Sequence, residues 1–198
     1  MSNYEEIIQN NLQQLYSNLS ADLADRIPAS QNDNEFRLRA FGAPCRITPQ
    51  HIKIGDQTQT GPPGIIVSLY ALQVTAAACQ LRPFKAFREL PDSMPYVGAF
   101  ASNTESVLAD HIDTVEREAG RIIEQFNGSH QAQADTGDFS FILYPLPKIA
   151  LNYIFYRADD EFPAAVTCLF SSNAPEFLTT DALADTGEYT SKKILDIL

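Results

Sequence analysis

The chain of 198 residues contains no tryptophan, two methionines and three cysteines. Cys45, Cys79 and Cys168 are odd in number and far apart, which excludes the paired disulfide framework of a small secreted protein. Each has apolar neighbours, and a free thiol in such surroundings behaves as a small buried hydrophobe. The sequence therefore predicts structural cysteines, with no iron-sulfur ligands among them.

Long hydrophobic runs and targeting signals are also missing. The longest apolar segment, between Pro63 and Leu81, is interrupted by five polar or hydroxyl-bearing residues and is typical of a buried helix rather than a membrane span. The first ten residues contain two glutamates and no basic region before an apolar stretch, unlike a secretory signal. We therefore expect a cytoplasmic location.

Positive charge is scarce. The 14 basic residues are outnumbered by 25 acidic ones, so the formal net charge is -11. Such a surface repels phosphate backbones and anionic lipid headgroups, and neither nucleic acid nor membrane is an expected partner. Hydrophobic residues make up 44% of the chain, enough to bury a core, and we expect a single domain over residues 1–198.

Recognisable catalytic patterns are absent as well. The sequence has no phosphate-binding glycine loop, no GxSxG nucleophile elbow, and no Cys or His spacing typical of a metal site. We expect no catalytic residue, no metal site and no cofactor from these patterns, and they favour a protein that is not an enzyme.

The N-terminal third predicts one helix followed by a small antiparallel meander. Ser2 and Glu5 have capping-box spacing, and apolar residues then recur at helical intervals, which indicates a helix over residues 3–25. From Phe36 onwards the alternation is that of a half-buried strand. If Pro49 and Gln50 form a hairpin turn, Cys45 faces Ile54 across the sheet.

The remainder predicts three more helices and three strands. The patterns indicate helices over residues 65–81 and 102–126 and a closing helix from Thr180, with the segment 82–101 as an ordered, proline-rich loop. For the 102–126 helix, Ser102 and Glu105 have capping-box spacing, and Asn127 and Gly128 are the expected C-cap. Aromatic and β-branched runs predict antiparallel strands over residues 139–144, 149–157 and 165–170. The expected fold class is α+β, an antiparallel sheet or sheets with helices packed mainly on one side.

Two groups of polar residues are candidate ligand-binding sites. Arg88 and Glu89, followed by Tyr96, lie where a guanidinium and a phenol would meet at the mouth of a pocket beneath the 82–101 loop. The alternative is a local ion pair of Arg88 with Asp92 or with the acidic residues 159–161.

The second group is the acidic corner formed by Asp159, Asp160 and Glu161. Three carboxylates on a turn offer the oxygen ligands that calcium or magnesium prefers. The alternative is a solvated acidic turn, because no glycine at the bend and no second ligand set of the EF-hand type accompanies them.

Several segments resemble a known family: FRELP at 87–91, the PYVGAF loop, LPKIALNYIFY, ADDEFPA at 158–164 and CLFSSNAPEFL at 168–178. Together they resemble a bacterial and archaeal domain of unknown function, family number 3786, over residues 36–198. The resemblance implies an origin among anaerobes, where some members are joined to a cysteine-rich iron-sulfur module. It implies no catalytic residue.

Three functional hypotheses follow. The first is a non-enzymatic accessory or protein-interaction domain of anaerobic metabolism linked to iron-sulfur or corrinoid proteins, with another protein or a second copy as partner. The second is a small-ligand or metal-binding protein that uses Arg88, Tyr96 and the acidic corner, with a pocket under the 82–101 loop. The third is an enzyme that uses the same pocket. An exposed apolar patch favours the first, and a concave polar pocket favours the second.

Overall fold

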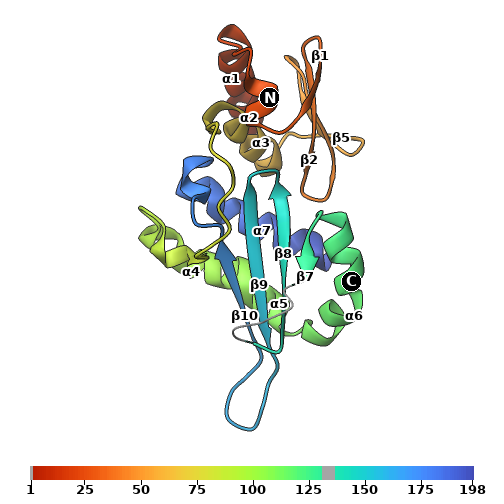
Figure 1. Ribbon diagram of the computed structural model, residues 1–198, viewed down its shortest axis with the longest axis vertical. Helices are drawn as coiled ribbons and strands as arrows, with labels where there is room; N and C mark the ends of the chain where they lie inside the picture. Colours follow the sequence, from red (N-terminus) through yellow and green to blue (C-terminus); the bar gives the residue numbers. More distant parts are fainter. Residues whose placement is uncertain (1, 131–136) are drawn as a thin grey trace.

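The computed structural model describes residues 2–130 and 137–198, and it has the α+β fold expected from the sequence (Figure 1). Two antiparallel sheets are present. The smaller follows chain order: β1 (Ser30–Asn32), β2 (Glu35–Ala40), β3 (Ala43–Ile47), β4 (Ile52–Ile54) and β5 (Gln57–Thr58). The larger has the order β6 (Lys85–Ala86), β10 (Ala165–Phe170), β9 (Ile149–Tyr156), β8 (Phe139–Leu146) and β7 (Ser129–His130).

The smaller sheet confirms the predicted hairpin register. Cys45 faces Ile54 across β3 and β4, and both side chains are buried. The backbone N–H of Thr48 donates to the carbonyl of His51 at 3.0 Å and closes the turn at Pro49 and Gln50. Because β residues alternate between faces, Cys45 points into the core, where burial raises the pKa of its thiol to about 12.

The helix expected over residues 3–25 is divided in two. α1 (Asn3–Ser17) begins with the predicted capping box at Ser2, and α2 (Leu23–Arg26) follows a turn in which the Ser20 hydroxyl donates to Asp22. Hydroxyl and carboxylate side chains of this kind compete with the helical backbone for hydrogen bonds, which explains the interruption.

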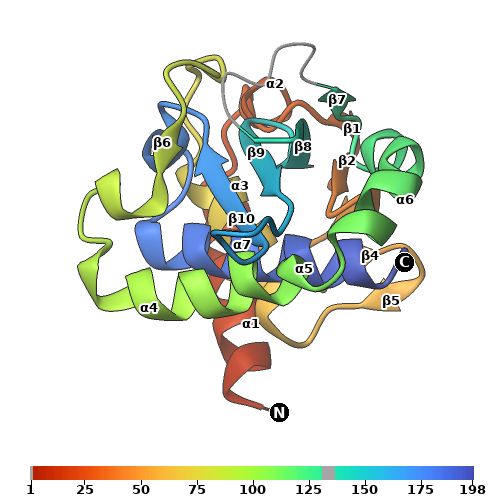
Figure 2. The same ribbon diagram turned by 90° about the horizontal axis from the view of Figure 1, so that it is seen from below.

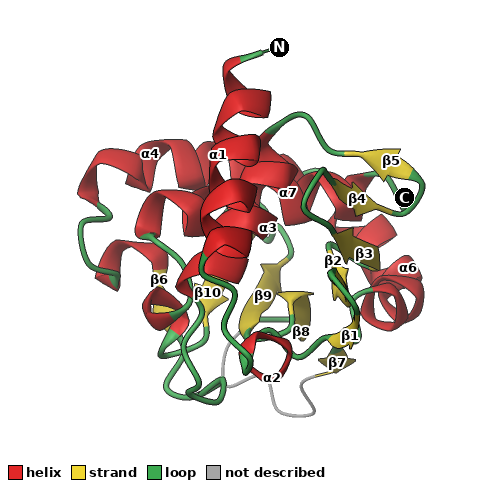
Figure 3. Ribbon diagram, turned by 90° about the horizontal axis from the view of Figure 1, so that it is seen from above, coloured by secondary structure: helices red, strands yellow, loops and turns green. Residues whose placement is uncertain are grey.

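α1 packs across α3 (Pro62–Gln73), as Figure 3 shows. At their crossing a Cβ on Gly64 would lie 2.6 Å from Cδ1 of Ile8, so only glycine permits this approach. α3 ends at Gln73, eight residues earlier than predicted. Two buried or partly buried cations cap its carboxyl end: Arg26 Nη1 donates to the Val74 carbonyl at 3.2 Å, and Lys148 Nζ donates to the Thr75 carbonyl at 2.9 Å.

α7 (Thr180–Leu195) covers one face of the larger sheet and lies behind it in Figure 1. The hydroxyl of Tyr153, at the centre of β9, lies 3.0 Å from Ser191 Oγ on α7. α6 (Ile112–Gln125) packs beside β8. Just after the end of β10, the N–H of Ser172 donates to the carbonyl of Gln80 at 2.7 Å.

The loop over residues 82–101 is ordered and contains short helical turns, η1 (Phe87–Glu89) and η2 (Met94–Tyr96). A third short turn, η4 (Ala174–Glu176), precedes α7. From Val97 the chain runs through α4 (Val97–Phe100), a π-helical segment η3 (Ala101–Ser106) and α5 (Val107–Ala109) beside α7 (Figure 2).

The helix predicted to begin at Ser102 is therefore wrong at its start. The chain is already helical from Val97, and the 102–126 segment is broken at Asp110 and His111 before α6 begins. The predicted C-cap is present, since Asn127 adopts a left-handed backbone with φ of 50°.

Candidate ligand-binding pocket

A cavity of about 320 Å³ lies beneath the 82–101 loop, at the edge of the larger sheet where β10 extends beyond β6. It lies between η1, the helical segment from α4 to η3, and β10. Its lining residues are Ala86, Phe87, Arg88, Val97, Phe100, Ala101, Glu105 and Thr167. The volume is at the lower end of the range of small-molecule sites.

The pocket wall is formed mainly by two aromatic rings. Phe87 and Phe100 are stacked with centroids 4.3 Å apart and an angle of 9° between their planes, and both side chains are buried. Phe87 comes from η1 and Phe100 from α4, so the stack fixes the distance between the loop and the helical segment. A rigid apolar wall of this kind favours the apolar body of a ligand.

Arg88 reaches this cavity from η1, and its side chain is exposed. The ion pairs with Asp92 or the acidic corner that were the alternative interpretation do not form: among residues 2–130 and 137–198, no side chain or carbonyl pairs with its guanidinium. Glu89 has a local role, because its Oε2 accepts the backbone N–H of Ala86 at 2.6 Å and closes the η1 turn.

Glu105 lines the pocket from η3, and the sequence did not identify it as a site residue. Its Oε1 accepts the backbone N–H of Cys168 on β10 at 2.9 Å. This hydrogen bond replaces one that a neighbouring strand would otherwise make with Cys168. Burial raises the pKa of Glu105, while the Cys168 N–H and the charge of Arg88 act in the opposite direction. Arg88 and Glu105 are thus electrostatically coupled without forming an ion pair within the described chain.

A buried polar network behind Glu105 holds η3 against α7. Ser191 Oγ donates to the carbonyl of Thr104 at 2.7 Å and also contacts the Tyr153 hydroxyl. Close packing continues at Gly187, where a Cβ would lie 2.6 Å from Cε2 of Phe100. The π-helical turn, a feature often found at functional sites, accompanies these contacts and directs Glu105 towards β10.

The other predicted site residues lie apart from the cavity lining. Tyr96 is on η2, is 40% exposed and does not belong to the residues that line the pocket. Asp159, Asp160 and Glu161 lie in the loop between β9 and β10, which extends at the bottom of Figure 1.

Within the acidic corner, Asp159 Oδ1 accepts the backbone N–H groups of Glu161 at 2.8 Å and Phe162 at 2.7 Å. These bonds lower the pKa of the Asp159 carboxyl. In the part of the chain that the structure describes, no three His, Cys, Asp or Glu side chains gather as a metal site would require.

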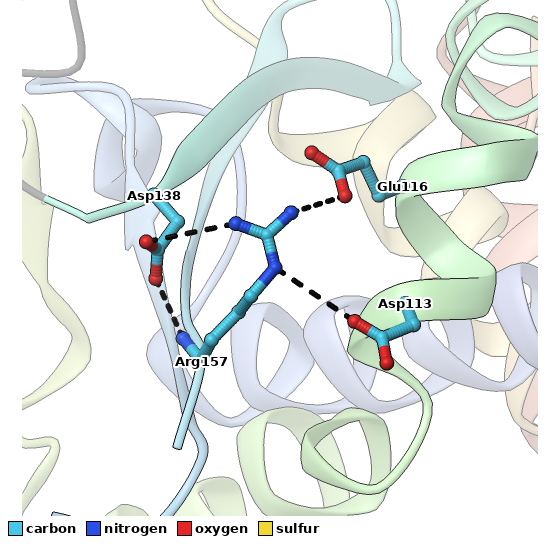
Figure 4. Close-up of polar contacts among 4 residues, drawn as sticks. All are labelled: Asp113, Glu116, Asp138 and Arg157. Atoms are coloured by element: carbon cyan, nitrogen blue, oxygen red, sulfur yellow. Dashed lines mark hydrogen bonds and ion pairs between the residues drawn. The ribbon is translucent and has the colours of Figure 1, made fainter. Parts of the chain in front are cut away.

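A second arginine, Arg157 at the end of β9, has a different environment (Figure 4). Its guanidinium lies among three carboxylates: it donates to Glu116 on α6, with Asp113 at 3.7 Å and Asp138 at 3.6 Å. Its own backbone N–H also donates to Asp138, at 2.6 Å. These carboxylates raise the pKa of Arg157, and the cluster joins α6 to the larger sheet.

The described residues also line two other cavities. One, of about 470 Å³, lies between α1 and the smaller sheet. There Glu5 accepts the Ser2 N–H at 2.6 Å and the Gln9 amide donates to the Gln50 carbonyl at 3.0 Å. The other, of about 230 Å³, lies between α3 and α7, where Glu188 pairs with Lys192 at 2.5 Å. The Arg88 pocket is intermediate in volume and differs from both because its lining includes an arginine with no partner among the described residues.

The fold and site define an α+β protein with two antiparallel sheets and one pocket whose lining holds an unpaired cation opposite a carboxylate. The chain belongs to the family Domain of unknown function (DUF3786), whose model matches residues 20–193. All residues that line the Arg88 pocket fall inside this range, whereas the cavity beside α1 includes residues before it. No curated protein and no solved structure matches the chain. No helix among the described residues is long and apolar enough to cross a membrane.

Proposed function

We propose that this protein binds a small ligand through an anionic group, a carboxylate or a phosphate, in the pocket beside Arg88. The observation that carries the proposal is the Arg88 guanidinium, which lines a cavity and has no partner among the described residues. A planar guanidinium offers two parallel N–H donors, and carboxylate and phosphate oxygens match that geometry.

The contrast with other arginines of the chain supports this interpretation. Arg26, Arg39 and Arg157 each donate to a carbonyl or a carboxylate of the protein. Arg46 on β3 is exposed and also has no partner among the described residues, but it lines neither the Arg88 pocket nor the two other cavities. Arg88 is set apart because it lines a cavity together with a carboxylate. The apolar wall of Phe87 and Phe100 gives a ligand additional surface to bury.

The test is a thermal-unfolding screen against inorganic phosphate and short carboxylates. Unfolding is monitored by circular dichroism because the chain has no tryptophan for fluorescence. A ligand at 100 times its dissociation constant adds about 2.7 kcal/mol to the free energy of unfolding. Arg88→Met should abolish the shift. Arg117→Met on α6, where the guanidinium contacts Thr114, is the matched control and should leave it unchanged. A shift that survives Arg88→Met, or no shift with phosphate or with any carboxylate, amino acids included, would contradict the proposal.

A second candidate is the accessory or protein-interaction role. Two exposed apolar side chains on η2 favour it: Met94 is 77% exposed and Tyr96 is 40% exposed. Contact with a second copy would give a concentration-dependent mass in sedimentation, and replacing Met94 and Tyr96 by serine should abolish it. The link to anaerobic metabolism, the cytoplasmic location and the lack of nucleic-acid partners stay predictions.

A further inference from the structure

The pocket presents two opposite charges that do not meet. Arg88 comes from η1 and Glu105 from η3, and both line the same cavity. Within the described residues they form no ion pair, although the charge of Arg88 partly opposes the rise in the Glu105 pKa that burial causes. The cavity therefore presents a positive and a negative group that are not paired with each other.

Glu105 is held in place by only one of its two oxygens. Oε1 accepts the N–H of Cys168 at 2.9 Å, and Oε2 has no hydrogen-bond partner in residues 2–130 or 137–198. The carboxylate is therefore fixed by the sheet edge and keeps one acceptor available. Oε2 of Glu105 is thus available to accept a hydrogen bond from a donor group of a ligand.

The groups behind Glu105 add no charge. The thiol of Cys168 and the hydroxyl of Tyr153 are buried, and burial raises the pKa of each, so both are neutral at pH 7. The nearby Glu188, on α7, accepts a hydrogen bond from the Asn103 amide of η3 and pairs with Lys192. The charge of the pocket is thus that of one guanidinium and one carboxylate.

The remaining lining is almost entirely apolar. Phe87, Phe100 and Val97 are joined by two alanines, and Thr167 is the one other residue of the lining with a polar side chain. A ligand that pairs with both charges must therefore carry them on a compact, mainly aliphatic or aromatic body.

On the basis of the proposed function, we infer that the ligand is a zwitterion, a free amino acid or a similar amino-carboxylate, with its carboxylate at Arg88 and its ammonium at Glu105. A simple anion at Arg88 would lie near the Glu105 carboxylate, and a simple amine at Glu105 would lie near the guanidinium. In a small cavity either arrangement brings like charges together, whereas a zwitterion pairs both.

The inference is tested by calorimetric titration at pH 7 with matched ligands. Alanine, valine and leucine are each compared with the acid that lacks the amino group and the amine that lacks the carboxylate; for leucine these are 4-methylpentanoate and 3-methylbutylamine. We expect at least one amino acid to bind ten or more times tighter than both of its partners.

Variants separate the two charges. Glu105→Gln retains an oxygen acceptor for the Cys168 N–H, and it should lower amino-acid affinity to that of the matching acid while leaving the acid's affinity unchanged or higher. Glu124→Gln on the exposed face of α6 is the control and should change neither.

The outcomes distinguish the two proposals. If the acids bind through Arg88 as tightly as the amino acids, or if Glu105→Gln leaves the difference intact, the zwitterion inference is overturned and anion binding stands. If phosphate, acids and amino acids all fail to bind, both are overturned.

Discussion

Arg88 and Arg157 lie at opposite extremes of how a protein treats a guanidinium. Arg157 has three carboxylates around it (Figure 4). It also lies over the ring of Phe139, 5.8 Å from the centroid. Arg88 has no partner among the described residues and lines a cavity. Both are exposed arginines close to strands of the larger sheet, so residue type and exposure alone do not separate them.

The difference shows what each site is suited to do. At Arg157 the donors are used within the protein, so the cluster connects α6 to β9 and leaves little for a ligand. At Arg88 the donors are available, and a fixed acceptor, Glu105, lies across the cavity. An arginine whose donors are paired with protein carboxylates stabilises the fold, whereas an arginine whose donors are not paired can bind a ligand.

The largest effect is expected from a substitution that enlarges a side chain behind the pocket. Gly187→Leu on α7 would push against Phe100, which is buried and stacked on Phe87. We expect a loss of about 3 kcal/mol in the free energy of unfolding, measured by urea denaturation, together with weaker ligand binding.

Gly120→Ala on α6, the helix that carries Glu116 and Asp113, is the counterpart in the Arg157 region. A Cβ at Gly120 meets nothing within 4 Å, so the variant should gain up to about 1 kcal/mol from helix propensity. Equal stability of the Gly187→Leu protein and the wild type would show that the pocket wall is loosely packed, contrary to the structure.

A smaller, pH-dependent effect is expected for Glu105→Gln without ligand. Because burial raises the Glu105 pKa above its ordinary value of 4.5, folding disfavours the ionised form. The stability that the protonated carboxyl contributes is complete below pH 4.5 and is lost as the pH rises through the folded-state pKa. The variant should therefore melt at a higher temperature than the wild type at pH 7, and the difference should close on acidification. A difference that does not vary with pH would contradict this assignment.

The smallest effect is expected from the Arg157 cluster itself. Arg157→Met should lower the melting temperature slightly at low salt, and the deficit should shrink in 1 M NaCl because exposed ion pairs are screened. Arg88→Met should show a smaller salt-dependent deficit, since Arg88 forms no ion pair within the described residues and its charge acts only at a distance on Glu105. If the two variants respond alike to salt, the contrast between these arginines is not real.

Local patterns in the sequence were sufficient for the three central strands of the smaller sheet and the three long strands of the larger one. The hairpin between β3 and β4 was predicted with its register, because alternation of Cys45, Ile47, Ile52 and Ile54 permits one pairing that buries all four. The predicted strand over residues 165–170 agrees with β10, and the other two predicted strands agree with β8 and β9 to within two residues at each end.

The candidate site could be predicted only in part. Arg88 was identified and lies in a pocket under the 82–101 loop, but Glu105 was interpreted as the capping residue of a helix beginning at Ser102. That interpretation was reasonable, since Ser102 and Glu105 have capping-box spacing. The helix instead begins at Val97, and the Glu105 carboxylate satisfies the N–H of Cys168, 63 residues away in the chain.

By itself the sequence determined the fold class, the long strands and the excess of acidic residues, because composition, hydrophobic periodicity and turn residues can be recognised from the chain or from a few neighbouring residues. Only the tertiary structure decided which charges would be paired. Arg157 acquired Glu116 from α6, 41 residues away, whereas Arg88 was placed opposite Glu105 across a cavity. Contacts of this kind depend on how helices and strands are packed in space, and no local spacing records them.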